Sequence, residues 1–241
     1  PPSTHGASFE WRWLDHHNVT LAEHFKEQGY RTFAFSANPN LSRRGANLLQ
    51  GFDAVQTSWN SRWWPIVRAA TRRKLIREDA STEISPSFEG KRPGNGYYNG
   101  APATGRAFFR WMDRQPRDEP WLAYLNYMEA HKPRVPRLEH RQEIMPPEQQ
   151  QLALETDVSF LNQMAYGYRV HEYTDEELAA ANGVYDACLR ELDGYLFRLT
   201  EALKKRGVYD DTIIVLTSDH GETLGEHHRF GHRYGMYQTL L

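Results

Sequence analysis

The feature that most constrains this chain is the stretch at residues 212–232, where a strand-like run leads directly into metal-ligand side chains. Residues 213–216 read IIVL, a composition typical of a short strand that is buried on both faces. Asp219 and His220 follow this run. Because ligands bind at the carboxyl ends of strands in open α/β sheets, the stretch predicts a metal or catalytic site at this strand end.

A second group of polar side chains follows, in what we expect to be a loop shaped by Gly225 and Gly231. A simpler alternative is that Asp219 caps a helix and that the histidines are solvated. The coincidence of a strand, two ligand types, glycines and further imidazoles favours a functional site. The group comprises Glu226, His227, His228 and His232.

Length and composition bound the possible classes of protein. The 241 residues, with 25% charged and 39% apolar side chains, suit one large globular domain. A net charge of −2 argues against a nucleic-acid binder, and no apolar run approaches the ~20 residues of a membrane span. The single cysteine, Cys188, excludes a disulfide framework and fits a core thiol. The chain opens on Pro1 without a Met, so we expect an internal fragment and leave compartment and oligomeric state open.

Helix and strand patterns alternate along the chain. Capping boxes at Thr20 with Glu23 and at Thr174 with Glu177 begin two helices, the second of them long and amphipathic, and Phe108 lies on the apolar face of a third. Strands are expected at residues 32–35, 121–128 and 213–216. This order predicts a parallel sheet covered by helices, with long insertions near residues 40–100 and 133–173. The three strand ends carry Asn38, His131 and the pair Asp219 and His220.

Residues 59–77 mix tryptophans with arginines, and two explanations stay open. One is a basic aromatic surface for nucleic acid, an anionic lipid or an acidic substrate. The other is an amphipathic helix that packs its tryptophans, Ile66 and Val67 on the core and keeps its arginines in water, which we prefer.

The residue types near residue 219 indicate a particular chemistry. An Asp and a His side by side suit Mn²⁺, Zn²⁺ or Fe, whereas Ca²⁺ prefers oxygen ligands, and at least one further carboxylate is needed. His131 and His232 are candidates to hold an anionic group or to protonate a leaving oxygen. A metal ion beside a tetrahedral anion would polarise its oxygens, so hydrolysis of a sulfate or phosphate ester follows.

At these residues the chain resembles the sulfatase family of the alkaline phosphatase superfamily. The resemblance is most specific at residues 210–222, which are similar to the family's metal-binding strand. The other matching segments are Thr4-His5-Gly6, Leu21-Ala22-Glu23 with residues 29–32, residues 126–133 with their His-x-Pro strand end, Gly225-Glu226-His227, and Gly231-His232.

The resemblance implies an α/β fold of the alkaline phosphatase type. This is a three-layer sandwich with a mostly parallel sheet and helices on both faces, of which residues 1–241 would be part of a single catalytic domain truncated at both ends. Carried over, Asp219 and His220 are metal ligands, His131 and His232 contact the sulfate and the bridging oxygen, and His227 lies near the substrate. The expected cofactor is one divalent ion, Ca²⁺ by family, with Mn²⁺ or Zn²⁺ plausible because of His220. The family's nucleophile, a formylglycine, would lie upstream of Pro1.

Two departures from the family pattern keep alternatives open. Many sulfatases have Asp-Asn where this chain has Asp219-His220, a pairing more similar to phosphonate monoester hydrolases and related phosphodiesterases. Where sulfatases often have Gly-Lys-Trp-His, this chain has Ser36-Ala37-Asn38-Pro39. The family resemblance as a whole still leads us to expect hydrolysis of sulfate esters of small molecules or saccharides. The alternatives are a phosphodiester or phosphonate monoester hydrolase, a phosphoryl-type transferase, and a non-catalytic module that binds an acidic polymer.

Overall fold

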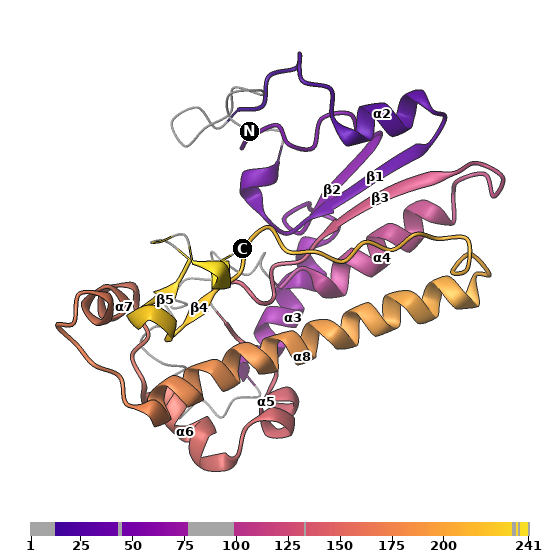
Figure 1. Cartoon of the computed structure of the whole chain (residues 1–241). Coiled ribbons are helices and arrows are strands. Elements are labelled where there is room, and N and C mark those ends of the chain that lie inside the picture. The colour runs from indigo at the N-terminus through magenta and orange to yellow at the C-terminus, as the bar shows by residue number, and fades with distance from the viewer. Residues whose placement is uncertain are drawn as a thin grey trace. The chain divides into compact units, whose positions relative to one another are not determined.

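The computed structural model describes residues 13–42, 45–76, 99–132, 134–232, 235 and 237–240, and its elements alternate along the chain (Figure 1). Residues 77–98 of the insertion predicted near residues 40–100, the Thr4-His5-Gly6 match and Pro133 of the His-x-Pro match lie outside the described residues. The chain divides into two compact units, residues 1–72 with 94–129 and residues 73–93 with 130–241. Unit 1 contains α2 (Leu21–Glu27), β1 (Arg31–Ser36), η1 (Pro39–Leu41), β2 (Ala54–Thr57), α4 (Ala101–Met112) and β3 (Trp121–Asn126).

Unit 2 contains the remaining elements except α3 (Trp64–Ile76), which begins in unit 1 and ends in unit 2. Among the described residues, no helix is both long and apolar enough to cross a membrane. The elements of unit 2 are α5 (Leu138–Ile144), α6 (Pro147–Glu155), α7 (Phe160–Gly167), α8 (Asp175–Lys205), β4 (Thr223–Leu224), η3 (Glu226–His228), β5 (Phe230–Gly231) and η4 (Gln238–Leu240).

A parallel sheet forms the centre of unit 1, as the sequence predicts. Its strand order is β2-β1-β3, with both pairings parallel and Ala34 of β1 in register with Val55 and Tyr124. β1 is buried on both faces because helices cover it, with α2 and α4 on opposite sides (Figure 1). On the α4 side, Phe33 stacks on Trp111 with ring centroids 5.1 Å apart. The α/β class and the parallel sheet are therefore confirmed.

The helix α2 begins and ends where local chemistry requires. The Thr20 hydroxyl accepts a hydrogen bond from the Glu23 amide at 3.3 Å, and the Thr20 amide donates to the Glu23 carboxylate at 2.8 Å. This reciprocal pair is the predicted capping box, and it satisfies two amides that the first turn leaves unpaired. Gly29 then takes a left-handed φ of 85°, which suits glycine and ends the helix.

The carboxyl ends of β1 and β3 meet at one edge of the sheet. The Asn126 side-chain oxygen accepts hydrogen bonds from the Ser36 hydroxyl at 3.0 Å and from the Asn38 amide at 3.1 Å. The Asn38 side chain in turn accepts from the Asn40 amide at 3.0 Å and begins η1. Asn38 therefore lies at the predicted strand end, where it organises the turn.

The long helix α8 carries the core of unit 2. A second capping box at Thr174 and Glu177 begins it, as predicted, and Cys188 is buried along it. Glu191, only 1% exposed, forms an ion pair at 2.9 Å with Lys74 and accepts the Arg137 amide at 3.1 Å. The Glu191 carboxylate therefore caps α5, whose own N-cap residue provides no side-chain cap.

One strand prediction is wrong. Residues 213–216 form no strand, and their side chains are between 48% and 92% exposed. The described residues provide this segment with no paired strand, and a β-branched composition alone cannot satisfy its amides and carbonyls. The composition of the segment suits a strand, but among the described residues of its own unit the strands are those of the short β4–β5 hairpin.

The helical explanation of residues 59–77 is confirmed over its described part. Trp63 and Val67 are buried at 4% and 0% exposure, while Arg68, Arg72 and Arg73 are exposed. Lys74 departs from the pattern because it is buried in the ion pair with Glu191. The segments predicted as insertions contain β2 and α3 in the first case, and α5, α6 and α7 in the second.

Candidate functional site

Three of the predicted histidines lie together in unit 2. The ring centroids of His220 and His232 are 4.1 Å apart, and those of His131 and His232 are 5.7 Å apart. His131 follows β3 in the chain, His220 precedes β4, and His232 follows β5. Segments separated by almost 90 residues in sequence thus contribute to one group of imidazoles, as the sequence analysis predicts.

In each of the three rings the Nδ1 atom has a fixed partner. His131 Nδ1 lies in hydrogen-bond contact with the Lys132 carbonyl, and His220 Nδ1 is 2.7 Å from the Gly221 carbonyl. His232 Nδ1 is 3.2 Å from the Glu222 carboxylate. Since carbonyl and carboxylate oxygens only accept hydrogen bonds, Nδ1 must be the donor in each ring. In His220 and His232, Nε2 is therefore the ring nitrogen that these contacts do not use.

A buried ion pair stands behind His232. The side chains of Glu222 and Arg134 are each 7% exposed, and Arg134 Nη2 is 3.0 Å from Glu222 Oε2. Burial by itself would raise the pKa of Glu222, but the hydrogen bond from His232 and the charges of Arg134 and Lys132 outweigh it and lower this pKa. Glu222 therefore stays ionised and keeps its role as an acceptor.

His131 is held in its neutral form. Burial lowers its pKa, and the neighbouring His232 and His220 rings add to the effect, while the Lys132 carbonyl and Glu222 oppose it. A neutral imidazole with its proton on Nδ1 presents a lone pair at Nε2. His131 is therefore suited to accept a proton or to bind a cation near neutral pH.

Lys132 adds a positive charge to the same part of unit 2. Its Nζ atom donates to the Gln163 side chain at 2.7 Å and lies 5.1 Å from the centroid of the Phe230 ring. Gly231 has a φ of 94°, and a Cβ atom there would lie 3.2 Å from Lys132 Nζ and 3.3 Å from Glu222 Oε1. A side chain at this position would crowd both charged groups.

Asp219 and His220 fit as two of the ligands of a divalent ion. Asp219 Oδ1 and His220 Nε2 are 3.9 Å apart, and both atoms are accessible because the side chains are 84% and 35% exposed. The Gly221 carbonyl holds the other ring nitrogen of His220, as is usual for metal-ligating histidines. Within the described part of the chain, no group of three or more His, Cys, Asp or Glu side chains is arranged to hold a metal ion. Further ligands must therefore come from outside this pair.

His227 lies apart from the three histidines in its contacts. Its ring stacks on Tyr237 at 4.1 Å, and the next residue, His228, stacks on Tyr166 at 4.0 Å and contacts Glu172 at 3.1 Å. Both His227 and His228 have left-handed φ values, 56° and 57°, which are uncommon outside glycine and often mark functional loops. The predicted substrate contact of His227 stays a prediction.

Three residues of the site were not singled out by the sequence analysis: Lys132, Arg134 and Glu222. Glu222 ends the segment that resembles the metal-binding strand, and the two basic residues follow His131 closely. What could have indicated them in the sequence is that they lie close to His131 or His220 in the chain. Their pairing, however, depends on contacts between segments that are far apart in the chain.

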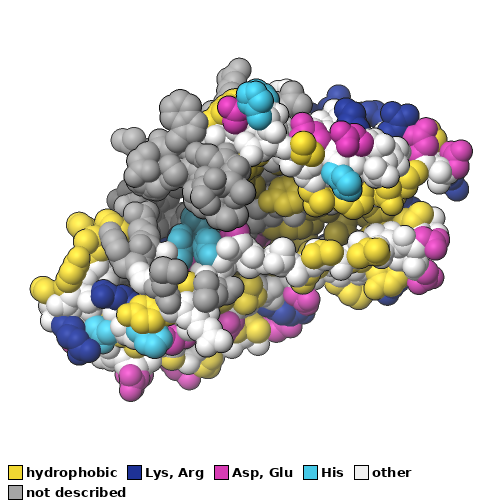
Figure 2. All heavy atoms as spheres, turned by 45° about the horizontal axis from the view of Figure 1, so that its top comes forward, with side chains coloured by type: hydrophobic (Ala, Val, Ile, Leu, Met, Phe, Trp, Pro, Cys, Tyr) yellow, Lys and Arg dark blue, Asp and Glu magenta, His cyan; other side chains and the backbone are white. Residues whose placement is uncertain are grey.

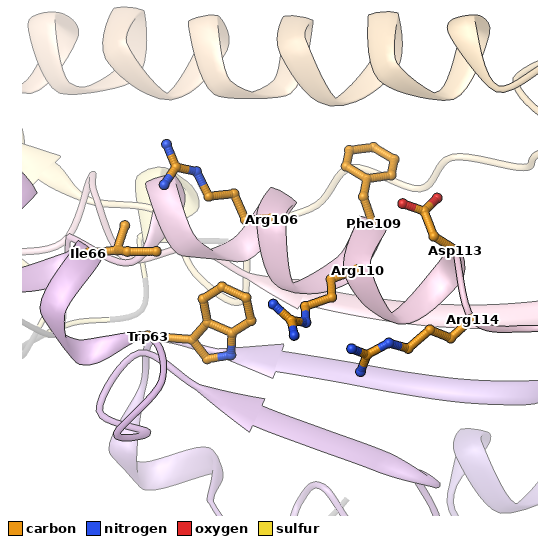
Figure 3. A pocket seen from close by; sticks show the side chains of 7 residues that line it. All are labelled: Trp63, Ile66, Arg106, Phe109, Arg110, Asp113 and Arg114. Carbon is orange, nitrogen blue, oxygen red and sulfur yellow. The ribbon is translucent and has the colours of Figure 1, made fainter.

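Unit 1 contains a separate pocket of about 550 Å³ next to α4. Arg106, Arg110 and Arg114 line it at four-residue spacing, and Arg110 and Arg114 project toward the side on which the Trp63 indole lies (Figure 3). All three arginines are exposed. Elsewhere, basic and acidic side chains are interspersed on the face that Figure 2 shows. The pocket is lined by Trp63, Ile66, Arg106, Phe109, Arg110, Asp113 and Arg114.

Comparisons with curated relatives match short parts of this chain. It is 42% identical over 55 residues to the multifunctional alkaline phosphatase superfamily protein PehA of Trinickia caryophylli, covering 23% of this chain and 11% of that protein. It is 36% identical over 66 residues to arylsulfatase K of Xenopus laevis, covering 27% of this chain and 12% of that protein. The chain therefore matches only a small part of the length of these relatives.

Two solved structures match the fold of this chain over almost its whole length. The phosphonate monoester hydrolase of Agrobacterium radiobacter matches with a TM-score of 0.61 and 21% identity, over 95% of this chain and 52% of that one. The phosphonate monoester hydrolase SpPMH of Silicibacter pomeroyi matches with a TM-score of 0.57 and 20% identity, over the same shares. The chain spans about half the length of these proteins, and the likeness shows that it has their fold.

The family model described as Sulfatase matches residues 2–239, almost the whole chain. Together with the fold, this match means that the chain belongs to the sulfatase family of the alkaline phosphatase superfamily.

Proposed function

We propose that this protein hydrolyses sulfate esters with the help of a divalent metal ion, and that His131, His220 and His232 form part of its active site. The observation that carries the proposal is the group of three imidazoles whose rings lie together and whose Nδ1 atoms are all held by fixed partners. Such a group can hold the oxygens of a tetrahedral anion and exchange a proton with a leaving oxygen. Membership of the sulfatase family supports the same reaction class.

Each residue has a distinct role in the proposal. Asp219 and His220 hold the metal ion, which when bound supplies Lewis-acid polarisation of the ester oxygens. His131, whose pKa burial lowers in the free protein, contacts the anionic group of the substrate by taking up a proton on Nε2 when the anion binds. His232 donates to the bridging oxygen through Nε2, and Lys132 contributes positive charge that favours an anionic substrate.

Phosphodiester or phosphonate monoester hydrolysis is the main alternative reaction. It is favoured by the pairing of Asp219 with His220 and by the likeness to two proteins named as phosphonate monoester hydrolases. A phosphoryl-type transferase would use the same groups with an alcohol in place of water. These reactions share the site and differ in substrate and acceptor.

The test of the proposal is metal content together with turnover of two esters by the protein in its natural full length. Calcium with turnover of nitrophenyl sulfate supports sulfate-ester hydrolysis. Manganese or zinc with turnover of bis-nitrophenyl phosphate supports phosphodiester or phosphonate hydrolysis instead. A metal-free protein that turns over neither ester overturns the enzymatic proposal.

A second candidate function is the binding of an acidic polymer, and the pocket next to α4 favours it. Three exposed arginines at four-residue spacing, next to the partly exposed Phe109 ring, offer positive charge to a polyanion. The double replacement Arg106→Glu and Arg110→Glu should then abolish salt-dependent retention on immobilised heparin, whereas Arg198→Glu should not. Equal retention of both variants would contradict this candidate.

A further inference from the structure

We propose that Glu222, held in place by Arg134, is a positioning residue that fixes the His232 ring so that its Nε2 atom faces the substrate. This inference deepens the proposed function, on which its kinetic part rests. The feature behind it is the buried chain of contacts from Arg134 through Glu222 to His232, with separations of 3.0 Å and 3.2 Å.

The local backbone brings Glu222 and His232 to the same place. β4 and β5 pair antiparallel with Thr223 opposite Gly231, so the residue before Thr223 lies opposite the residue after Gly231. The Thr223 hydroxyl also donates to the Gly231 carbonyl, which fastens this end of the hairpin. The hairpin register therefore determines that Glu222 meets His232, and the absence of a side chain at Gly231 leaves room for the Glu222 carboxylate.

Arg134 is held on several sides, which makes it a firm anchor for Glu222. Its Nε atom donates to the Ala130 carbonyl at 3.3 Å, and its guanidinium lies 4.8 Å from the centroid of the Tyr185 ring. Its Nη2 atom forms the ion pair with Glu222. A buried carboxylate with such a partner is held in place, since rotating it away would leave both buried charges unpaired.

The orientation of His232 follows from the chemistry of its partner. An ionised carboxylate can only accept, so His232 must carry a proton on Nδ1 and turn that edge toward Glu222. Nε2 then lies on the opposite edge of the ring, which packs at a tilt of 34° against His220. Carboxylates behind functional histidines commonly act in this way, and their loss typically costs about 10–100-fold in activity or metal affinity.

The test removes the carboxylate without leaving a buried guanidinium unpaired. The double replacement Glu222→Leu with Arg134→Met should lower kcat about 10–100-fold and change KM little, because it disturbs a step after binding. The loss should be larger for a phenyl ester than for a nitrophenyl ester, because a poorer leaving group needs the proton more. The matched control is Glu191→Leu with Lys74→Met, which removes a second buried ion pair and should leave kcat within about twofold.

A mutant cycle separates positioning from general damage. His232→Ala should remove the benefit of Glu222, so adding the Glu222→Leu and Arg134→Met changes to it should cause no further loss of kcat. Equal losses in the presence and absence of His232 would overturn the proposal, as would wild-type kcat in the variant without Glu222. If that variant does not fold, Glu222→Gln takes its place, because it weakens the hydrogen bond to His232 while keeping the side-chain shape.

Nitrogen NMR of the full protein distinguishes failure of this proposal from failure of the proposed function. The His232 Nδ1–H signal should be present in the wild type and be lost with Glu222, whether or not any ester is turned over. If the protein turns over no ester but shows this change, the positioning of His232 is supported and the proposed reaction is refuted. A His232 signal that does not respond to Glu222 refutes the positioning.

Discussion

At the scale of single residues, Asp219 and His220 differ sharply from the groups behind them. Asp219 is 84% exposed and lies 3.9 Å from the His220 ring, whereas Glu222 is 7% exposed and contacts both Arg134 and His232. Exposed oxygen and nitrogen atoms 3.9 Å apart are available to an ion without breaking existing contacts. The residues that would bind the ion are therefore different from the buried residues that stabilise the fold around them.

We predict that Asp219→Asn lowers bound metal and ester turnover to background while the far-UV circular dichroism stays unchanged. The amide is a much weaker ligand than the carboxylate, and an 84% exposed side chain contributes little to the core. Elemental analysis and nitrophenyl ester assays measure both effects. Asp193→Asn on α8, where the side chain is 76% exposed, is the control and should behave like the wild type. Undiminished metal content in Asp219→Asn would rule out this ligand.

At the scale of elements, the turn at Gly51 limits what α2 can tolerate. Gly51 has a φ of 85°, and a Cβ atom there would lie 2.5 Å from Glu23 Cγ and 2.8 Å from the Glu23 amide nitrogen. Both atoms belong to the capping box that begins α2. The start of the helix and this turn therefore depend on each other.

We predict that Gly51→Ala lowers the free energy of unfolding by more than ~1 kcal/mol, because it combines a left-handed φ with a clash against backbone. Gly105→Ala in α4 is the matched control, since nothing lies within 4 Å of its added Cβ. That substitution should stabilise by about 0.5–1 kcal/mol through the lower entropy of the unfolded chain. Urea unfolding of the two variants measures the difference, and destabilisation by both would contradict this explanation.

A second element-scale contact links α2, β1 and the turn before β2. Asp53 accepts from the amide and the hydroxyl of Thr32, both at 3.1 Å, and pairs with Lys26 at 2.5 Å. Partial burial opposes ionisation of Asp53, but the hydrogen bonds from Lys26 and Thr32 outweigh it and hold its pKa below the ordinary value of 3.8. A depressed folded-state pKa stabilises the protein above the unfolded pKa, and this stability is lost as pH falls through the folded one.

We therefore predict that Asp53→Asn destabilises the protein at pH 7 and that its deficit shrinks as the pH falls from about 4 through the lowered folded-state pKa of Asp53, because the wild-type carboxylate then becomes protonated in the folded protein too. Urea unfolding of both proteins at several pH values measures the deficit. Asp211→Asn, at an exposed position, should show no such trend. A deficit that does not change with pH would mean that the carboxylate charge contributes nothing.

At the scale of the whole molecule, the family match and the fold likeness agree with each other, whereas the reaction is a proposal. The sulfatase match covers residues 2–239, and the solved structures with the same fold are named as phosphonate monoester hydrolases. Both reactions use a metal ion beside a tetrahedral anion, so metal removal tests them together.

We predict that chelation followed by dialysis abolishes turnover of either ester and that adding back a divalent ion restores it. The far-UV circular dichroism should change little, because Asp219 and His220 are at least 35% exposed and carry no buried contacts of the core. Calcium, manganese and zinc added singly identify the preferred ion. Full activity after chelation would contradict a metal-dependent reaction.

The sequence alone was sufficient for the elements whose causes are local. The capping boxes at Thr20 and Thr174, the length of α8 and the strands β1 and β3 depend on residues within a few positions of one another, so their patterns are visible in the chain. The likeness in motifs also identified the family and the grouping of His131, His220 and His232.

Only the tertiary structure decided which distant groups meet. The contact of Arg134 with Glu222 joins segments almost 90 residues apart, and the burial of Lys74 with Glu191 joins segments even further apart in sequence. The same dependence explains the wrong strand at residues 213–216, because a strand exists only where a second segment pairs with it. Hydrogen bonds within a helix are set by the chain itself, whereas buried ion pairs and strand pairing require a partner that the local sequence does not specify.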